Sequence, residues 1–195
     1  DITPCIAGQF IEVPGTTTTD QTCGACTDGT NFSSVANAAS CTPLTNCDPN
    51  ANETTAATVT NDRECECKAG YFGPGSTCTE WKVCQPGEYV TGEASNTDDR
   101  TCGACTAGTN FSTTENAASC TGVTTCVAGQ YVEVPGTTTT DQSCGACTDG
   151  TNFSSVANLA SCTPLTNCDP NANETTAATV TNDRECECKV GYFGP

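Results

Sequence analysis

The sequence predicts a small, disulfide-rich fold of mostly irregular chain with short β-strands, repeated in tandem to form an elongated rod. Two observations lead to this prediction: of the 195 residues, 19 are cysteine and only 24 are Leu, Ile, Val or Phe. Such a cysteine content is typical of disulfide scaffolds, and so few large apolar side chains rarely build a core. Covalent links must therefore limit the entropy of the unfolded chain, because burial cannot offset the entropy of ordering.

Internal repeats set the predicted organisation. Residues 5–74 recur at 126–195 with six differences in 70 positions, and each long copy contains a shorter period of about 40 residues that begins at a cysteine. Near-identity over this length indicates an array that was copied in blocks. The predicted domains are five cysteine-rich repeats: 5–46, 47–83, 84–125, 126–167 and a truncated 168–195.

Each complete repeat has four cysteines, which can close two loops. We expect sequential pairing: Cys5–Cys23, Cys26–Cys41, Cys47–Cys65, Cys67–Cys78, Cys84–Cys102, Cys105–Cys120, Cys126–Cys144, Cys147–Cys162 and Cys168–Cys186. An interleaved pattern, such as Cys5–Cys26 with Cys23–Cys41, stays open at this point. The repeat arithmetic would place the partner of Cys188 beyond the last residue, so we expect truncation of the array rather than a reactive thiol.

Local patterns favour turns and short strands between the cysteines. Residues 10–13 and 131–134 are β-prone runs that end in Pro-Gly. The threonine runs 16–19 and 137–140 are β-branched and polar, which predicts exposed strands. Helix signals are almost absent, and residues 37–39 predict one turn at most.

Two phrases recur: Cys-x-x-Gly-x-aromatic before a Thr-rich stretch, and Cys-x-x-Gly-Thr-Asn-Phe-Ser. They stand at Gly8–Phe10, Gly87–Tyr89 and Gly129–Tyr131, and at Phe32-Ser33, Phe111-Ser112 and Phe153-Ser154. The pattern resembles the cysteine-rich repeats of the tumour necrosis factor receptor family and ephrin-receptor-like repeats, as in large surface proteins of microbial eukaryotes. The resemblance implies an elongated rod of small β-modules without a common core.

The chain departs from that family in two respects. Its repeats carry four cysteines instead of six, and the repeat from Cys47 lacks Gly-x-aromatic and begins Cys47-Asp48-Pro49-Asn50. Near-identical copies also argue against a receptor, whose modules usually diverge to shape one ligand surface.

The Gly-x-aromatic motif has a predicted packing role. We expect the glycine to let the chain turn and Phe10, Tyr89 or Tyr131 to cover a disulfide; contact between neighbouring chains is the alternative. We also expect Trp81 to pack at a junction between repeats. The Asp-Arg pairs at 62–63, 99–100 and 183–184 predict turns in which the aspartate accepts backbone hydrogen bonds.

Five Asn-x-Ser/Thr sequons predict N-linked sugar, each in an expected exposed loop: Asn31, Asn52, Asn110, Asn152 and Asn173. Composition also makes several threonines candidates for O-linked sugar: Thr16 to Thr19, Thr54, Thr55, Thr58 and Thr60. Sequons can arise by chance, but Asn110 lies in a divergent repeat and keeps the same frame. We therefore expect a glycoprotein.

No metal or other cofactor is expected. The Cys-x-x-Cys pairs at 23–26, 102–105 and 144–147 lack the second short pair that a four-cysteine zinc site needs. Acidic residues cluster at 62–66 and 183–187, and carboxylates suit calcium. This alternation around a cysteine matches no known calcium loop, and a solvated acidic surface is its commoner meaning.

Composition also excludes several functions and sets the compartment. The chain has no His and a net charge of −17, so a general base near neutral pKa is missing and neither nucleic acid nor anionic lipid is an expected partner. No apolar run is long enough to span a membrane. Residues 1–4 lack signal-peptide features, so we expect a mature or internal piece. Disulfides place the protein outside the cell, either secreted or at the cell surface.

Two functions remain as hypotheses, and neither is enzymatic. The first is a structural extracellular glycoprotein that forms a long, disulfide-stabilised and glycosylated rod or filament at a cell surface, with copies of itself as partners. The alternative is an adhesin or receptor ectodomain that binds a protein or glycan ligand. Residues 75–125 are the long segment not duplicated in the chain, so the alternative would place its binding surface there.

Overall fold

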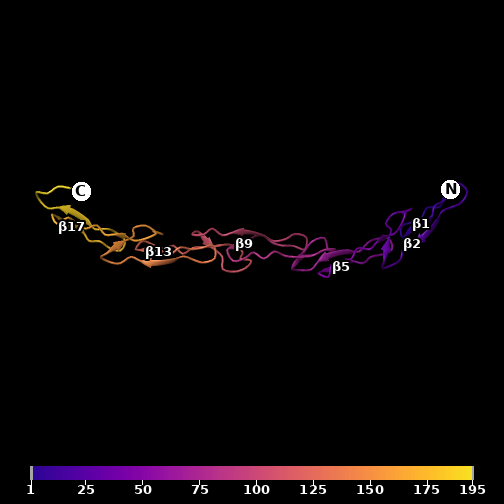
Figure 1. The fold of residues 1–195 in the computed structure, drawn as a ribbon, viewed down its shortest axis with the longest axis horizontal. Helices are drawn as coiled ribbons and strands as arrows, with labels where there is room; N and C mark the ends of the chain where they lie inside the picture. The colour runs from indigo at the N-terminus through magenta and orange to yellow at the C-terminus, as the bar shows by residue number, and fades with distance from the viewer. Residues whose placement is uncertain (1, 195) are drawn as a thin grey trace. The chain divides into compact units, whose positions relative to one another are not determined.

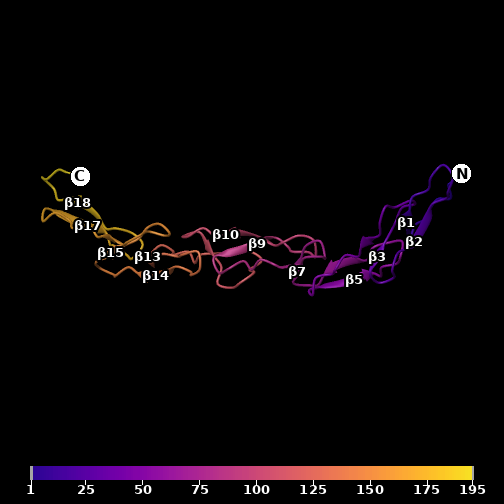
Figure 2. The same cartoon turned by 45° about the vertical axis from the view of Figure 1, so that its right-hand side comes forward.

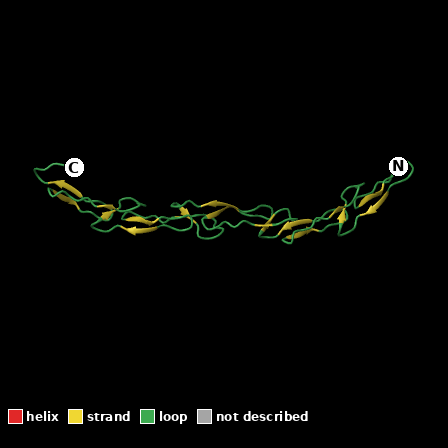
Figure 3. Cartoon of the chain, viewed as in Figure 1, coloured by secondary structure: helices red, strands yellow, loops and turns green. Residues whose placement is uncertain are grey.

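The computed structural model describes residues 2–194, which form short β-strands, turns and irregular chain but no helix (Figure 3). The strands are β1 (Gln9–Val13), β2 (Thr22–Ala25), β3 (Asn31–Phe32), β4 (Thr42–Pro43), β5 (Ala51–Thr55), β6 (Glu64–Cys67), β7 (Tyr71–Phe72), β8 (Thr79–Glu80), β9 (Glu88–Gly92), β10 (Thr101–Ala104), β11 (Asn110–Phe111), β12 (Thr121–Gly122), β13 (Gln130–Val134), β14 (Ser143–Ala146), β15 (Asn152–Phe153), β16 (Thr163–Pro164), β17 (Ala172–Thr176) and β18 (Glu185–Cys188). The predicted disulfide-rich tandem repeat with short strands is confirmed.

The chain divides into two compact units. The first runs up to Lys82 and includes Gly92–Thr101, and the second is Val83–Thr91 with the residues from Cys102 onward. In the first unit β1 pairs with β2, β3 with β4, β5 with β6, and β7 with β8, all antiparallel. In the second unit the same holds for β11 with β12, β13 with β14, β15 with β16, and β17 with β18. Long and short hairpins thus alternate within each unit (Figures 1 and 2).

Nine disulfides cross-link the described residues, and each joins consecutive cysteines. The pairs are Cys5–Cys23, Cys26–Cys41, Cys47–Cys65, Cys67–Cys78, Cys84–Cys102, Cys105–Cys120, Cys126–Cys144, Cys147–Cys162 and Cys168–Cys186. The first disulfide of a repeat spans 18 residues and encloses a long hairpin, as Cys5–Cys23 does for β1. The second spans 15 or 11 residues and encloses a short hairpin. The pattern is sequential, not interleaved.

Sulfur takes the place of an apolar core. Among the described residues, the buried apolar side chains are all cysteines: Cys5, Cys26, Cys67, Cys84, Cys105, Cys126 and Cys147. The buried polar side chains are the serines of the Phe-Ser pairs, Ser33, Ser112 and Ser154. Aliphatic side chains such as Val35 and Val156 lie in solvent, at 60% and 55% exposure. Burial therefore contributes little, and the cross-links carry most of the order.

The Gly-x-aromatic motif forms the first turn and strand of its repeat. Gly8 has φ 85°, a left-handed conformation that glycine adopts without strain. Phe10 follows in β1 and pairs with Gly24 of β2. A Cβ added at Gly24 would lie 2.5 Å from the Phe10 ring, so the ring rests on that glycine. Tyr131 covers Gly145 in the same way. The predicted turn at the glycine and the packing of the aromatic ring are confirmed, but the partner of the ring is the glycine next to a half-cystine, where a disulfide was predicted.

The threonine runs are turns, so the prediction of exposed strands for residues 16–19 and 137–140 is wrong. The Thr16 hydroxyl oxygen accepts hydrogen bonds from the amides of Thr18 and Thr19, at 3.2 and 3.0 Å. The Thr16 amide in turn donates to the Thr19 carbonyl at 2.9 Å. These local bonds compete with strand pairing, and they outweigh the β-propensity of the side chains. The predicted strands at residues 10–13 and 131–134 are confirmed as parts of β1 and β13.

Candidate functional site at the repeat junctions

One aspartate per repeat binds the linker that leads into the same repeat. Asp62 accepts the Thr45 amide at 2.9 Å through one oxygen and the Thr45 hydroxyl at 2.6 Å through the other. Asp62 also accepts the Arg63 amide at 2.8 Å, which closes a turn. The same arrangement joins Asp141 to Thr124 and Asp183 to Thr166, and Asp20 and Asp99 accept the amides of Thr3 and Lys82. The predicted turn-forming role of Asp62 is confirmed, and its bond to the linker is an addition.

These hydrogen bonds favour the ionised carboxylate. Bonds from the Thr45 hydroxyl and then the Thr45 amide hold the pKa of Asp62 below its ordinary value of 3.8. Bonds from Thr124 act in the same order on the pKa of Asp141, and the pKa values of Asp20 and Asp183 are lowered likewise by Thr3 and Thr166. The carboxylate is therefore ionised at neutral pH, and its hydrogen bonds to the linker are charge-assisted and stronger than bonds between neutral groups. We call each such aspartate, with the linker residue that it binds, the aspartate clamp.

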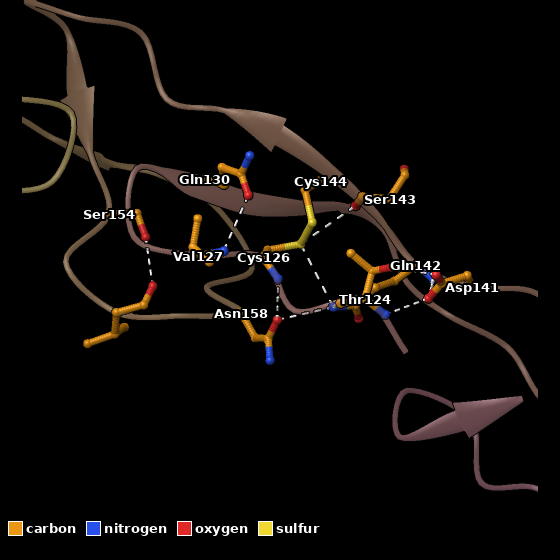
Figure 4. Close-up of a disulfide and its surroundings, with 11 residues drawn as sticks. Thr124, Cys126, Val127, Gln130, Asp141, Gln142, Ser143, Cys144, Ser154 and Asn158 are labelled. Carbon is orange, nitrogen blue, oxygen red and sulfur yellow. Dashed lines mark hydrogen bonds between the residues drawn. A yellow bond between two sulfur atoms is a disulfide. The ribbon is translucent and has the colours of Figure 1, made fainter. Parts of the chain in front are cut away.

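In each repeat that contains the Phe-Ser phrase, one asparagine binds the first cysteine of the repeat, directly after the linker. The main-chain amide of Asn158 donates to the Cys126 carbonyl at 2.8 Å. The side-chain oxygen of Asn158 accepts the main-chain amide of Cys126 at 2.9 Å (Figure 4). Its side chain also accepts from Gln142 at 3.1 Å. Asn158 has φ 55°, a left-handed conformation that asparagine tolerates. Asn37 and Asn116 repeat these bonds to Cys5 and Cys84. The chain turns at Ala36 and Asn37, and no helical turn forms over residues 37–39.

The threonine-type turn of each later repeat binds the repeat before it. The second residue of that turn offers its carbonyl to an amide of the preceding repeat. The four bonds are Ser33 to Val59, Gly73 to Asn96, Ser112 to Thr138 and Ser154 to Val180, at 2.9 to 3.0 Å. Within the described residues, every boundary between consecutive repeats therefore has a main-chain hydrogen bond.

At the boundaries after the first, third and fourth repeats, side chains of the turn also pack on the left-handed glycine of the preceding repeat. A Cβ added at Gly8 would lie 3.2 Å from Val59 and 3.4 Å from Thr60. At Gly87 the corresponding neighbours are Thr138 and Thr139, at 3.1 and 3.2 Å. The glycine thus allows both the turn of its own chain and close approach of the next repeat.

Ser33 connects these contacts and is buried for that reason. Its carbonyl accepts the Gly8 amide at 2.8 Å, its amide donates to Val59 at 3.0 Å, and its hydroxyl donates to the Val35 carbonyl at 2.9 Å. Every polar group of a residue that is 3% exposed is therefore satisfied. Ser112 and Ser154 have the same three bonds. The sequence pattern marked these serines as the end of a recurring phrase and as the third residue of a sequon, and neither predicts that they are buried.

Trp81 and Arg100 reinforce one junction in the first unit. The Trp81 indole donates to the Ser95 carbonyl at 2.8 Å, and the Arg100 guanidinium lies 5.8 Å from the ring centre. Arg100 also donates to the Lys82 carbonyl at 3.0 Å. The prediction that Trp81 packs at a junction is confirmed.

The five sequons lie in short strands, so the prediction that each lies in an exposed loop is wrong. Asn31, Asn110 and Asn152 are half-buried strand residues whose side-chain oxygens accept the amides of Thr27, Thr106 and Thr148, each at 2.7 Å. The amide nitrogen of Asn31, which would carry a sugar, has no protein acceptor within residues 2–194. These asparagines lie in hairpins because β3 pairs with β4, β11 with β12 and β15 with β16.

Asn52 and Asn173 form a second class of sequon because they are exposed. Asn52 pairs with Glu66 in the β5–β6 hairpin, at the place where Phe10 pairs with Gly24 in the first repeat. The aromatic–glycine pair is thus replaced by two polar residues. An ion pair supports the hairpin instead, with Arg63 at 2.9 Å from Glu53. This ion pair is partly exposed and contributes roughly 0 to 1 kcal/mol.

The cysteines considered for zinc are all engaged elsewhere. Cys23 and Cys26 belong to two different disulfides, as do Cys144 and Cys147. In the acidic segment, Asp62 holds the linker and Glu64 accepts the Thr55 hydroxyl at 2.7 Å. Residues 2–194 contain no group of three or more Cys, Asp or Glu arranged to hold a metal ion.

Cys188 is the described cysteine outside the disulfides, and it is half-buried beside the Gly194 carbonyl at 3.9 Å. It occupies the place that Cys67 has in the earlier long copy, where Cys67 pairs with Cys78. No helix in the described part of the chain is long and apolar enough to cross a membrane.

Comparison with known proteins gave structural neighbours but no sequence relative. No family model matches the chain, and no curated protein matches it. A chain from the crystal structure of a mouse RANKL–OPG complex is similar at 20% identity and TM-score 0.45, covering 63% of this chain and 90% of that one. A chain from a human RANKL/OPG complex is similar at 24% identity and TM-score 0.41, covering 75% and 91%. A chain from a study of equine lentivirus receptor 1 gives 26% identity and TM-score 0.33, covering 40% and 82%.

Proposed function

We propose that this chain is part of a structural extracellular glycoprotein, an array of disulfide-stapled repeats that builds a stiff, sugar-coated rod or filament at a cell surface. The carrying observation is the repeated junction. At each boundary the turn of one repeat accepts an amide from the repeat before it, and an aspartate binds the linker. A contact that recurs at every boundary gives a uniform array, whereas a ligand-binding protein needs one boundary or face that differs.

Three further properties support the proposal. Nine disulfides suit an oxidising, extracellular place. A net charge of −17 with few exposed cations opposes unspecific clumping. Five sequons spaced along the chain would distribute sugar over its length. No catalytic group, metal or other cofactor enters the proposal, and the sugars are N-linked with O-linked sugar on exposed threonines.

Electron microscopy of the native material tests the proposal directly. We expect filaments with a repeat spacing that matches one repeat per step, and extra density where Asn52 and Asn173 stand. Small-angle scattering from the 195-residue chain should report a maximum dimension that grows when a 121-residue block is added. Compact particles, with no growth in maximum dimension after the addition, would refute the structural array.

A second candidate is an adhesin or receptor ectodomain for a protein or glycan. The observation that favours it is the Trp81–Arg100 pair, because the long duplicated segments contain no such pair. Trp81 is half-buried, so part of its surface is open to solvent. Cell-binding assays with Trp81→Phe and with Val35→Ala as the matched control would separate the candidates. Loss of cell binding in Trp81→Phe alone supports the adhesin.

A further inference from the structure

The five repeats contain five equivalent turns, of which four bind a preceding repeat. The turns begin at Thr16, Thr58, Ser95, Thr137 and Thr179. In the last four, the carbonyl of the second residue accepts an amide from the repeat before. In the first turn the corresponding carbonyl belongs to Thr17, and no described residue donates to it.

The fourth repeat supplies an internal control, because its turn has the same sequence as the first. Residues 15–20 and 136–141 both read Gly-Thr-Thr-Thr-Thr-Asp. Thr138 and Thr139 are half-buried under the third repeat, whereas Thr17 and Thr18 are exposed. Gly136 is buried and its carbonyl accepts the Gly108 amide at 3.1 Å, whereas Gly15 is half-buried. The same six residues therefore lie against a preceding repeat at 136–141 and without one, among the described residues, at 15–20.

The unoccupied turn borders an open hollow of about 630 Å³, lined by Ile2, Gly15 and residues 16–20. Ile2 forms its apolar wall and is 50% exposed. A Cβ added at Gly15 would lie 3.0 Å from the Ile2 side chain, and one added at Gly136 would lie 2.9 Å from Val123. Ile2 and Val123 thus have the same place, but Val123 is half-buried in the occupied form. We call Ile2, Gly15, Thr17 and Thr18 the open seat.

We propose that the open seat is a binding surface for the second half of a cysteine-rich repeat of the kind found at residues 105–122, and that it takes such a repeat when one is joined in line ahead of the first. The occupant would donate two amides, one to the Thr17 carbonyl as Ser112 does to Thr138, and one to the Gly15 carbonyl as Gly108 does to Gly136. Its left-handed glycine would pack on Thr17 and Thr18, as Gly87 packs on Thr138 and Thr139. The inference rests on the proposed array and names the partner of its first junction.

The four occupied turns indicate that the partner of the open seat is a repeat of the same chain that directly precedes it in sequence. Each takes the repeat that directly precedes it in sequence, and none takes a distant one. A linker of five residues separates the Cys120 and Cys126 half-cystines at the occupied junction. So short a connection gives a high effective concentration, which lets a few hydrogen bonds and methyl contacts suffice. A free repeat in solution would lack that advantage.

The test extends the chain by one repeat. A copy of residues 84–121 is joined ahead of residue 1, and disulfide mapping confirms native pairing. We expect the copied counterpart of Ser112 to exchange its amide hydrogen at the rate of Ser112 itself, within a few-fold. The methyl signals of Thr17 and Thr18 should move to the positions of Thr138 and Thr139 in NMR spectra. Thr18→Trp in the extended chain should then speed exchange of the copied amide about tenfold, the effect of one lost hydrogen bond.

Val35→Trp is the matched control, since Val35 is 60% exposed and lies outside the open seat. Equal exchange of the copied amide in both tryptophan variants, at the rate of an open amide, would overturn the inference. Concentration-dependent self-association of the unextended chain that Thr18→Trp abolishes would also overturn it, because the partner would then be a second copy. Filaments in which the copied amide stays unprotected would refute this inference alone. A protected copied amide in a protein that forms no filaments would refute only the proposed function.

Discussion

The Cys126–Cys144 disulfide allows a direct measurement of how much order comes from covalent links. In the double variant Cys126→Ala, Cys144→Ala the link is lost, but the two hydrogen bonds between residue 126 and Asn158 use backbone groups of residue 126 and can persist. The closed loop spans 18 residues. The chain-entropy treatment assigns about 3 kcal/mol to a loop of this size.

No apolar core compensates for that loss, because the buried apolar side chains among the described residues are all half-cystines. A loss of about 3 kcal/mol corresponds to roughly two orders of magnitude in the opening equilibrium. Hydrogen exchange with mass spectrometry should therefore show amides of the β13–β14 hairpin exchanging about 100-fold faster. Repeats contact only their neighbours, so the β5–β6 hairpin of the second repeat, which does not adjoin the fourth, should change little.

The Cys147→Ala, Cys162→Ala variant is the matched comparison. Its loop spans 15 residues, and the treatment predicts nearly the same loss, now in the β15–β16 hairpin. A change of less than about tenfold in the hairpins of both variants would refute the reasoning, since burial and hydrogen bonds would then order the repeat without the links.

Three further predictions concern the junction, the glycine contacts and the sugars. Folding lowers the pKa of Asp141, so its aspartate clamp stabilises the junction fully above the unfolded pKa of about 3.8, and this stability is lost as the pH falls through the folded pKa. The NMR shift of the Thr124 amide should therefore stay constant from pH 7 to 5 and move only below about pH 4. Asp141→Asn should remove that movement. Gly145→Ala places a Cβ 2.6 Å from the Tyr131 ring and should cost about 1 to 3 kcal/mol in hydrogen exchange of its hairpin, whereas Gly122→Ala, with nothing within 4 Å, should cost under about 0.5 kcal/mol. An endoglycosidase acting on the folded glycoprotein should release sugar from exposed Asn52 and Asn173 faster than from half-buried Asn31, Asn110 and Asn152, as glycopeptide mass spectrometry would show; equal rates would contradict the two classes of sequon.

Sequence reasoning succeeded where a residue type has one dominant role. Cysteine spacing led to the fold class, and the β-prone run at 10–13 led to β1. It failed at the threonine run 16–19, because β-propensity and local hydroxyl–amide bonding compete and only the folded geometry decides between them. The partner of Phe10 was also out of reach, since Gly24 lies opposite it only after a register shift in the hairpin.

The contacts between repeats were missed for a different reason. The turn residues that accept the inter-repeat amide are Val59, Asn96, Thr138 and Val180, which share no side-chain chemistry. The accepting group is the carbonyl, which every residue has, so the contact leaves no pattern in the sequence. The signals that could have found it are the aspartate that follows each turn and, where the preceding repeat has a Gly-x-aromatic motif, the left-handed glycine of that motif.

Main-chain recognition at the junction has a consequence for how such an array can grow. A repeat needs an amide to donate to the turn that follows it and an aspartate to bind its own linker, so the junction places few demands on the rest of the sequence. Repeat 2 illustrates this, because it carries Asn52 and Glu66 in place of the aromatic–glycine pair, yet its Val59 carbonyl accepts the Ser33 amide. The hairpin of repeat 2 therefore differs in sequence without losing the junction, and it carries the sequon at Asn52. Disulfides stabilise each repeat separately, so a copied block brings its own stability and the means to join its neighbours.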